Sequence, residues 1–332
     1  MPERDRVARG PGGALVVEVR PPCNYRLPLA RRYPDGVARS RQGVYERFLR
    51  VSGRPVLARA WALPRGEVAI AALPAPAAWL GSTDGEIASR DDLEIAVGRI
   101  RNALAVDDDL RPFFARFVRD PLLRPLIRRM PWYRVGRCPN PWEAFAWAVT
   151  EQLIESKRAA LIQRRIVGRW GTMLSFGGGA PPLADVPGPE VVAGVAPAEL
   201  AACDLAPKRA IALIRAAREI VAGRSDPAGP GGDVRLRAIP EVGPWTMQCL
   251  ALNGRGDFDS LPAGDLAYLL LVGHLANLGR RATIAEVEEF YAPYEPFRGL
   301  AGRFMLAGHG RTLRERPKLK YHPPNPEYEA AA

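Results

Sequence analysis

The sequence is poor in cysteine and holds no long apolar run. No stretch of about 18 apolar residues occurs, which excludes a hydrophobic membrane-spanning helix. The segment Met1–Gly10 lacks the apolar core of a signal peptide, so we expect a protein of the cytoplasm. The cysteines have neither CxxC nor another metal-ligand spacing, which favours a reducing compartment and excludes a clustered cysteine metal site. They are Cys23, Cys138, Cys203 and Cys249.

Lysine is also scarce, although the chain is basic. Of the 47 basic residues, only Lys157, Lys208, Lys318 and Lys320 are lysines. The long stretch between Lys208 and Lys318 therefore has no side-chain amine that could act as a nucleophile. The net charge of +11 and the pI near 9.9 favour a polyanionic partner such as nucleic acid, although solubility alone would explain the bias equally well.

The first part of the chain has the two-residue alternation and the turn residues of β-strands. A helix over Asp91–Leu104 would cover one face of the resulting sheet. We therefore expect an α+β amino-terminal domain over residues 1–105, built from an antiparallel sheet with a helix, in which residues 1–13 are flexible. The expected strands are Ala14–Val19, Gly43–Val51, Pro55–Ala62 and Glu67–Leu73.

The remaining chain has helical periodicity and is long enough for a second domain. Pro207–Val221 is a clear example, with proline at the helix start and apolar residues at helical spacing. We expect an all-α domain over residues 106–312, with glycine- and proline-rich loops at 176–189 and 222–232. Residues 313–332 are expected to form a flexible tail, whose basic residues are either simply solvated or add nonspecific attraction to a polyanion.

A helical hairpin is predicted within Leu236–Thr246. Pro240 stops the first helix, Gly243 supplies unusual backbone angles, and a second helix begins near Trp245. The outward N–H groups and the positive end of the second helix dipole would form a phosphate site that reads no sequence. An ordinary turn between two helices would tolerate the same proline and glycine residues, so the pattern alone leaves both interpretations open.

A second motif, Leu261–Asp265, places an acid in front of the apolar run Leu266–Val272. Asp265 stands where a helix N-cap is expected, and capping is its structural role. The same carboxylate, held ionised by the helix dipole, could face a cleft between this helix and the hairpin. There it would stabilise positive charge that develops on a sugar. The two roles are compatible.

Together these motifs resemble the helix-hairpin-helix, Gly/Pro-Asp superfamily of base-excision DNA glycosylases. The surroundings are most similar to its DNA-3-methyladenine glycosylase II branch. Pro141–Leu153 resembles the family helix that leads into a Gln-Leu or Gln-Gln pair, and Leu205–Ala210 resembles the start of its next helix. The resemblance covers roughly residues 90–310.

The resemblance implies hydrolysis without strand cleavage, because Trp245 occupies the place of the lysine that forms a Schiff base in bifunctional members. A monofunctional glycosylase would release alkylated, 3-methyladenine-like bases from double-stranded DNA during base-excision repair. It would act as a monomer, near the nucleoid if the source is bacterial. Asp265 would be its electrostatic stabiliser. The scattered cysteines exclude an iron–sulfur cluster, and an alkali cation at the hairpin is left open. The alternative is a helix-hairpin-helix DNA-binding protein without catalysis.

The resemblance also assigns roles to further residues. Leu153, beside Gln152, would be the wedge that fills the hole left by a flipped nucleotide, although core packing on an amphipathic helix is the alternative. Trp245 would line the base pocket, or else belong to the core. The residues that would contact the DNA backbone are Pro240, Val242, Gly243 and Thr246.

Three departures from the family pattern leave the substrate open. Glu241 stands where the usual hairpin has glycine, and its charge would repel phosphate unless the side chain turns away. Cys249 replaces a pocket tyrosine. The helix near Phe304–Leu306 lacks a pocket tryptophan.

Overall fold

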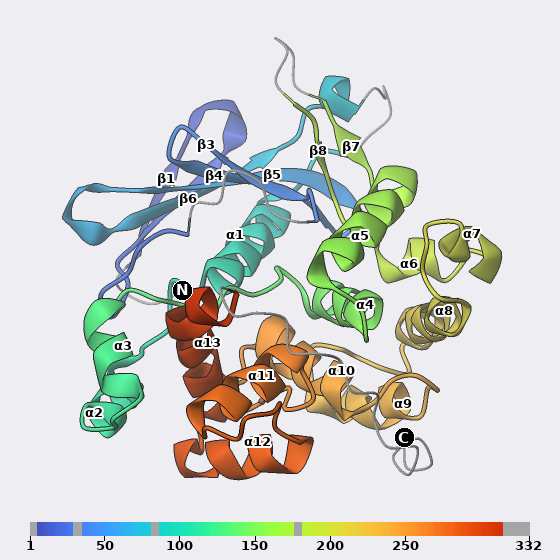
Figure 1. Ribbon diagram of the computed structural model, residues 1–332. Helices are drawn as coiled ribbons and strands as arrows, with labels where there is room; N and C mark the ends of the chain where they lie inside the picture. The colour runs from blue at the N-terminus through green and yellow to red at the C-terminus, as the bar shows by residue number, and fades with distance from the viewer. Residues whose placement is uncertain (1–4, 29–34, 81–85, 176–180, 315–332) are drawn as a thin grey trace.

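A six-stranded antiparallel sheet lies over a helical region in the computed structural model of the protein (Figure 1). The structure describes residues 5–28, 35–80, 86–175 and 181–314. The strands follow the order β1-β2-β6-β5-β4-β3 across the sheet. Their bounds are β1 Arg6–Arg9, β2 Leu15–Val19, β3 Ala38–Arg41, β4 Val44–Val51, β5 Arg54–Ala62 and β6 Val68–Pro74.

The alternation of side chains explains how helix α1, Arg90–Leu104, covers one face of this sheet. In β2 every second residue is fully buried, which gives the strand one apolar face. Helix α1 buries a matching stripe that includes Leu93, Val97 and Ile100. Its N-terminus is fixed by a capping box between Ser89 and Asp92. The predicted α+β amino-terminal part is confirmed.

The flexible segment that we predict over residues 1–13 is wrong for Arg6–Arg9. These residues form β1, an edge strand that pairs with β2 so that Val7 faces Val17. Strand β3 at the opposite edge is likewise absent from the sequence prediction. All four residues of β1 are exposed, so the strand carries no hydrophobic alternation that sequence analysis could detect.

The helical region contains two separate apolar cores. One core gathers α4, α5, α8 and α10, and the other gathers α2, α3, α11, α12 and α13. None of the helices in the described ranges is both long and apolar enough to cross a membrane. Their bounds are α2 Arg111–Phe117, α3 Leu123–Arg129, α4 Pro141–Glu151, α5 Ser156–Trp170, α6 Pro189–Val192, α7 Pro197–Ala201, α8 Pro207–Val221, α9 Asp233–Arg237, α10 Pro244–Leu250, α11 Leu266–Leu275, α12 Ile284–Tyr291 and α13 Arg298–Arg314.

Two details differ from the expected all-α domain. The stretch 176–189, predicted as a loop, contains the short strand β8, Leu183–Ala184, which pairs with β7, Met173–Leu174. This small ribbon packs against the large sheet, where Leu174 and Leu183 join a cluster with Phe48. At the other end, α13 extends to Arg314, and the rest of the predicted tail lies outside the described residues.

A buried ion pair joins the sheet to α4. The Arg47 guanidinium on β4 donates to the Glu143 carboxylate on α4 across 2.6 Å, and both side chains are almost fully buried. Asn140 caps the N-terminus of the same helix by accepting a hydrogen bond from the Glu143 N–H. The ion pair and the cap thus fix the position of α4, whose opposite end leads to Gln152 and Leu153.

Glu143→Ala should lower the free energy of unfolding by about 3 to 5 kcal/mol, because the buried guanidinium of Arg47 would lose its counter-charge. Urea denaturation followed by circular dichroism measures this change. The exposed pair Arg90–Glu94, 2.8 Å apart, provides the control, and Glu94→Ala should cost less than about 1 kcal/mol. Equal effects of the two substitutions would show that the buried pair does not stabilise the junction.

Candidate functional site

The predicted hairpin is present, but its unusual backbone conformation lies at a different residue. Helix α9 ends at Arg237 and α10 begins at Pro244. Glu241 has a φ of +73°, whereas Gly243 is extended with a φ of −94°. The expectation that Gly243 supplies the unusual angles is therefore wrong. The left-handed residue of this turn is Glu241, at the position where the usual hairpin has glycine.

Gly243 contributes open space instead. A Cβ atom built on this residue would meet no other atom within 4 Å. Gly243 is the N-cap residue of α10, and the first N–H groups of a helix have no acceptor inside that helix. A phosphate can therefore approach the start of α10, where the helix dipole favours negative charge.

Gln152 connects the end of α4 to both sides of the hairpin. Its Nε2 donates to the Glu241 carbonyl oxygen at 2.7 Å and to Thr246 Oγ1 at 2.9 Å. The next residue, Leu153, has a φ of +51° and is 98% exposed. Core packing of Leu153, the alternative left open by the sequence, is contradicted by this exposure. An apolar side chain thus projects into solvent directly beside the hairpin.

Close helix packing keeps these two segments together. Helix α10 continues into a wider helical turn, Ala251–Arg255, that packs against α4. A Cβ at Gly254 would lie 2.9 Å from the Cβ of Ala144, so only glycine allows this approach. The Cys138 N–H also donates to the Asn253 carbonyl oxygen at 2.8 Å. The hairpin and the Gln152–Leu153 segment therefore share one scaffold.

Asp265 is the N-cap residue of α11, as predicted. Its Oδ1 accepts a hydrogen bond from the Ala267 N–H at 2.8 Å. The Asp265 N–H donates to the Pro262 carbonyl oxygen at 2.9 Å, which fixes the turn that precedes the helix. The side chain is half-buried, and within the described chain its Oδ2 accepts no hydrogen bond. One carboxylate oxygen is thus used in capping and the other is free.

Trp245 lies beside the residue that precedes Asp265 in the chain. The residue before Asp265 is Gly264, and a Cβ built there would be 3.9 Å from Cδ1 of the Trp245 indole. The indole is half-buried, so it is neither a core side chain nor a fully solvated one. The structure therefore brings together Trp245 from α10 and Asp265 from the start of α11, two residues that the sequence separates by twenty positions.

Two polar residues of this region were missed by sequence analysis, Arg303 on α13 and Tyr268 on α11. Arg303 interacts electrostatically with Tyr268, Cys249 and Asp265, and these groups raise its pKa although burial opposes the charge. The Arg303 Nε and the Tyr268 hydroxyl are buried without a hydrogen-bond partner among the described residues. Arg303 directly precedes the Phe304–Leu306 segment, where the family tryptophan is missing. The missing tryptophan was the one sequence signal that this helix reaches the site.

Cys249 lines the same region as an uncharged thiol. Burial raises the pKa of its thiol far above neutrality, and the nearby carboxylates raise it further. A thiol in this state is a poor nucleophile, because the thiolate is the reactive form. The chemistry available here is therefore that of the Asp265 carboxylate, not that of a covalent cysteine.

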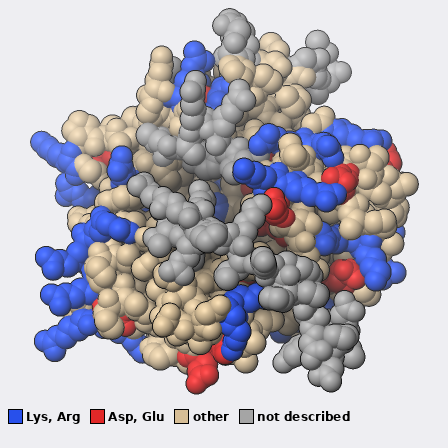
Figure 2. Space-filling model, viewed as in Figure 1, with Lys and Arg blue, Asp and Glu red and all other residues tan. Residues whose placement is uncertain are grey.

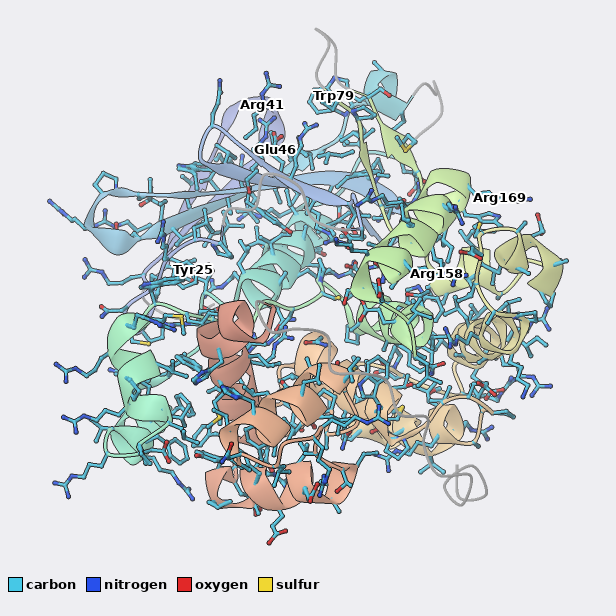
Figure 3. The ribbon with its side chains drawn as sticks, viewed as in Figure 1. Tyr25, Arg41, Glu46, Trp79, Arg158 and Arg169 are labelled. Atoms are coloured by element: carbon cyan, nitrogen blue, oxygen red, sulfur yellow. The ribbon has the colours of Figure 1, made fainter. Side chains whose placement is uncertain are left out.

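A basic side chain lies within electrostatic reach of the exposed hairpin residue Glu241. Burial lowers the pKa of Arg209, and the exposed carboxylate of Glu241 opposes this shift by attracting the guanidinium. Arg158 lies near the N-terminal end of α5, just beyond Leu153, and pairs with Asp204 at 3.1 Å (Figure 3). Arg209 thus offsets part of the phosphate repulsion expected of Glu241.

The hairpin carbonyl oxygens are partly engaged. Those of Ile239 and Glu241 accept hydrogen bonds from the Val242 N–H and the Gln152 amide. Each oxygen retains a second lone pair, and the alkali cation at the hairpin stays a prediction. No group of three or more His, Cys, Asp and Glu side chains in the described ranges is arranged to hold a metal ion.

Comparison with known sequences identifies two bacterial relatives, while no protein-family model matches the chain. A Mycobacterium tuberculosis protein named as a probable bifunctional transcriptional activator/DNA repair enzyme AlkA is 29% identical over 211 residues. The match covers 62% of this chain and 42% of the mycobacterial protein. The DNA-3-methyladenine glycosylase of Bacillus subtilis is 25% identical over 206 residues, which are 59% of this chain and 66% of that enzyme. The match therefore spans less than half the length of the mycobacterial protein.

Solved structures share the fold over most of the chain. The 3-methyladenine DNA-glycosylase of Archaeoglobus fulgidus superimposes with a TM-score of 0.72 at 19% identity, over 89% of this chain and 98% of that one. The Clostridium acetobutylicum 8-oxoguanine glycosylase/lyase, solved with double-stranded DNA, superimposes with a TM-score of 0.64 at 14% identity. This match covers 93% of this chain and 99% of that one. With the hairpin and the capping Asp265 in place, the chain is similar in sequence and fold to DNA glycosylases of the helix-hairpin-helix, Gly/Pro-Asp superfamily.

Proposed function

We propose that this protein is a monofunctional DNA glycosylase that removes alkylated, 3-methyladenine-like bases in base-excision repair. The observation that carries the proposal is the free Oδ2 of the half-buried Asp265, whose preceding residue Gly264 lies beside the indole of Trp245. Trp245 stands where a strand-cleaving relative would have its lysine, so only hydrolysis is available. The names of the Bacillus and Archaeoglobus relatives support the choice of substrate.

Binding would begin at the hairpin, which grips the DNA backbone whatever the base sequence. The damaged nucleotide must then leave the base stack, at a cost of a few kcal/mol. Leu153, which projects fully into solvent, would occupy the vacated position. The Trp245 indole would then receive the flipped base, and its electron-rich face attracts a cationic base by roughly 0.5 to 2 kcal/mol.

In the chemical step the bond between C1′ and the base nitrogen breaks, and its electron pair leaves with the base. A base that carries a positive charge becomes neutral on departure and needs no general acid. The deoxyribose gains oxocarbenium character, which the Oδ2 of Asp265 stabilises. Water then adds to C1′ and releases one proton to the solvent. Asp265 remains a carboxylate throughout and keeps its capping hydrogen bond to Ala267.

Arg303 would set the range of bases accepted. Its guanidinium lies within electrostatic reach of Asp265, and its Nε lacks a partner among the described residues. A cation at this place weakens the preference for a positively charged base and favours a base that carries an oxygen acceptor. The substrate range should therefore extend to damaged bases with a carbonyl oxygen.

Asp265→Asn should reduce base release from methylated duplex DNA at least about 100-fold, because the negative charge that stabilises the transition state is lost. Asparagine keeps an oxygen that can cap α11, so the thermal midpoint should stay unchanged. Chromatography of the released bases measures the effect. An unmodified protein that releases no alkylated or deaminated base would favour the DNA-binding alternative, and equal release by the variant would remove Asp265 from catalysis.

Leu153→Ala should slow release from a paired lesion roughly tenfold, because part of the few kcal/mol needed for flipping would no longer be recovered. The loss should shrink when the lesion faces an abasic site, since that base is already unpaired. Leu161→Ala is the matched control, a 49% exposed leucine on α5. A variant as fast as the control on both substrates contradicts the wedge role.

Glu241→Gly and Glu241→Gln should separate backbone strain from charge at the hairpin. Both remove a carboxylate near the phosphate site and should tighten binding to undamaged duplex DNA by about 1.5- to 5-fold. Only the glycine variant should also raise the unfolding free energy, by up to about 1 kcal/mol, since φ at this residue is +73°. Fluorescence anisotropy and urea denaturation give the two quantities. Unchanged DNA affinity in both variants would place the phosphate contact elsewhere.

A further inference from the structure

A cleft of about 430 Å³ borders the hairpin on its α9 side. It lies between the second half of α8 and the segment that runs from α9 into the hairpin. Four arginines and a single glutamate give its walls a formal charge of three positive units. We refer to it as the α8–α9 cleft. The lining residues are Arg215, Arg218, Glu219, Arg224, Arg235, Ala238, Ile239 and Pro240.

Helix geometry collects the charged side chains on one side of α8. Arg215, Arg218 and Glu219 are separated by three and four positions, so they share a helix face. Glu219 accepts from Arg224 at 2.6 Å and from Arg235 at 3.4 Å, which orients two exposed guanidinium groups around the cleft. One carboxylate cannot neutralise two guanidinium groups, so the cleft keeps excess positive charge.

Arg215 has no counter-ion at all within the described ranges. It is exposed, forms no ion pair and donates no side-chain hydrogen bond to any described residue. Among the described residues, the Arg218 side chain donates only to the Ala193 carbonyl oxygen, at 3.1 Å. Guanidinium groups that retain free donors match the oxygens of a phosphodiester, and they stay charged at every physiological pH.

The position of the cleft identifies its ligand. Pro240 lines the cleft and is also the first of the hairpin residues that would contact the DNA backbone. Phosphates recur about every 3.4 Å of axis along each DNA strand, so a strand held at the hairpin presents further phosphates nearby. We propose that the α8–α9 cleft binds backbone phosphates of the DNA beyond the hairpin contact. The choice of DNA as ligand rests on the proposed function.

The double variant Arg215→Gln/Arg235→Gln tests the cleft without touching Asp265, Trp245 or Leu153. Binding to undamaged duplex DNA is measured by fluorescence anisotropy over a range of salt concentrations. We expect a loss in affinity on the order of tenfold at about 0.1 M salt. We also expect a salt slope shallower by about two, roughly 0.9 per lost phosphate contact. Two duplexes of unrelated sequence should show the same loss, because phosphate contacts read no sequence.

The matched control is Arg124→Gln/Arg128→Gln on α3, which removes the same charge from two exposed arginines that line another hollow of the surface. Helix α3 lies on the opposite side of the molecule from α8 and α9 (Figure 1). Lys and Arg side chains are also numerous on the side of α3 (Figure 2). The control should lose less than about twofold in affinity and keep its salt slope. Equal losses in both variants would reduce the effect to net charge and overturn the proposal.

Two further measurements keep this test separate from the proposed function. Arg215→Lys/Arg235→Lys retains the charge, so it should restore most of the salt slope, and failure to do so together with normal folding would overturn a phosphate contact. Base release is assayed on the same preparations. A protein that never releases a base but loses DNA affinity in the cleft variant supports the cleft and refutes the enzyme. An active enzyme whose cleft variant binds DNA normally supports the enzyme and refutes the cleft.

Discussion

The packing of α4 against α10 and the turn that follows it is the constraint on which the rest of the site depends. The close approach at Gly254 brings the end of α4 to the hairpin, and the amide of Gln152 then links the two by hydrogen bonds on both sides of the turn. The buried pair Arg47–Glu143 fixes the same helix to the sheet. The amino-terminal sheet, remote from the chemistry, thus takes part in orienting it.

Much of this arrangement could be predicted from sequence, because it rests on local signals. Strands β2, β4, β5 and β6 show period-two alternation, α1 has clear helical periodicity, and the cap at Asp265 follows from an acid directly before an apolar run. The hairpin was found from Pro240 and the glycine nearby. These features need only a few neighbouring residues to specify them.

The features that escaped prediction depend on contacts distant in sequence or on exceptions to local preference. Strand β1 is fully exposed and exists because β2 offers a partner. The left-handed residue was assigned to Gly243 by its usual preference, while the turn places it at Glu241. Arg303 could not be assigned to the site, because α13 meets α11 only through tertiary packing. The exposure of Leu153 likewise required the structure to show that nothing covers it.

The conformation of Leu153 has a consequence for how damage would be found. The side chain projects outward in the free protein, so no rearrangement has to precede its contact with DNA. A protein that slides along the duplex with this projection in place would press on each base step that it passes. Weakly stacked nucleotides would yield and intact ones would resist. Lesions would then be selected first by how easily the nucleotide leaves the base stack, before the base itself is recognised in the pocket.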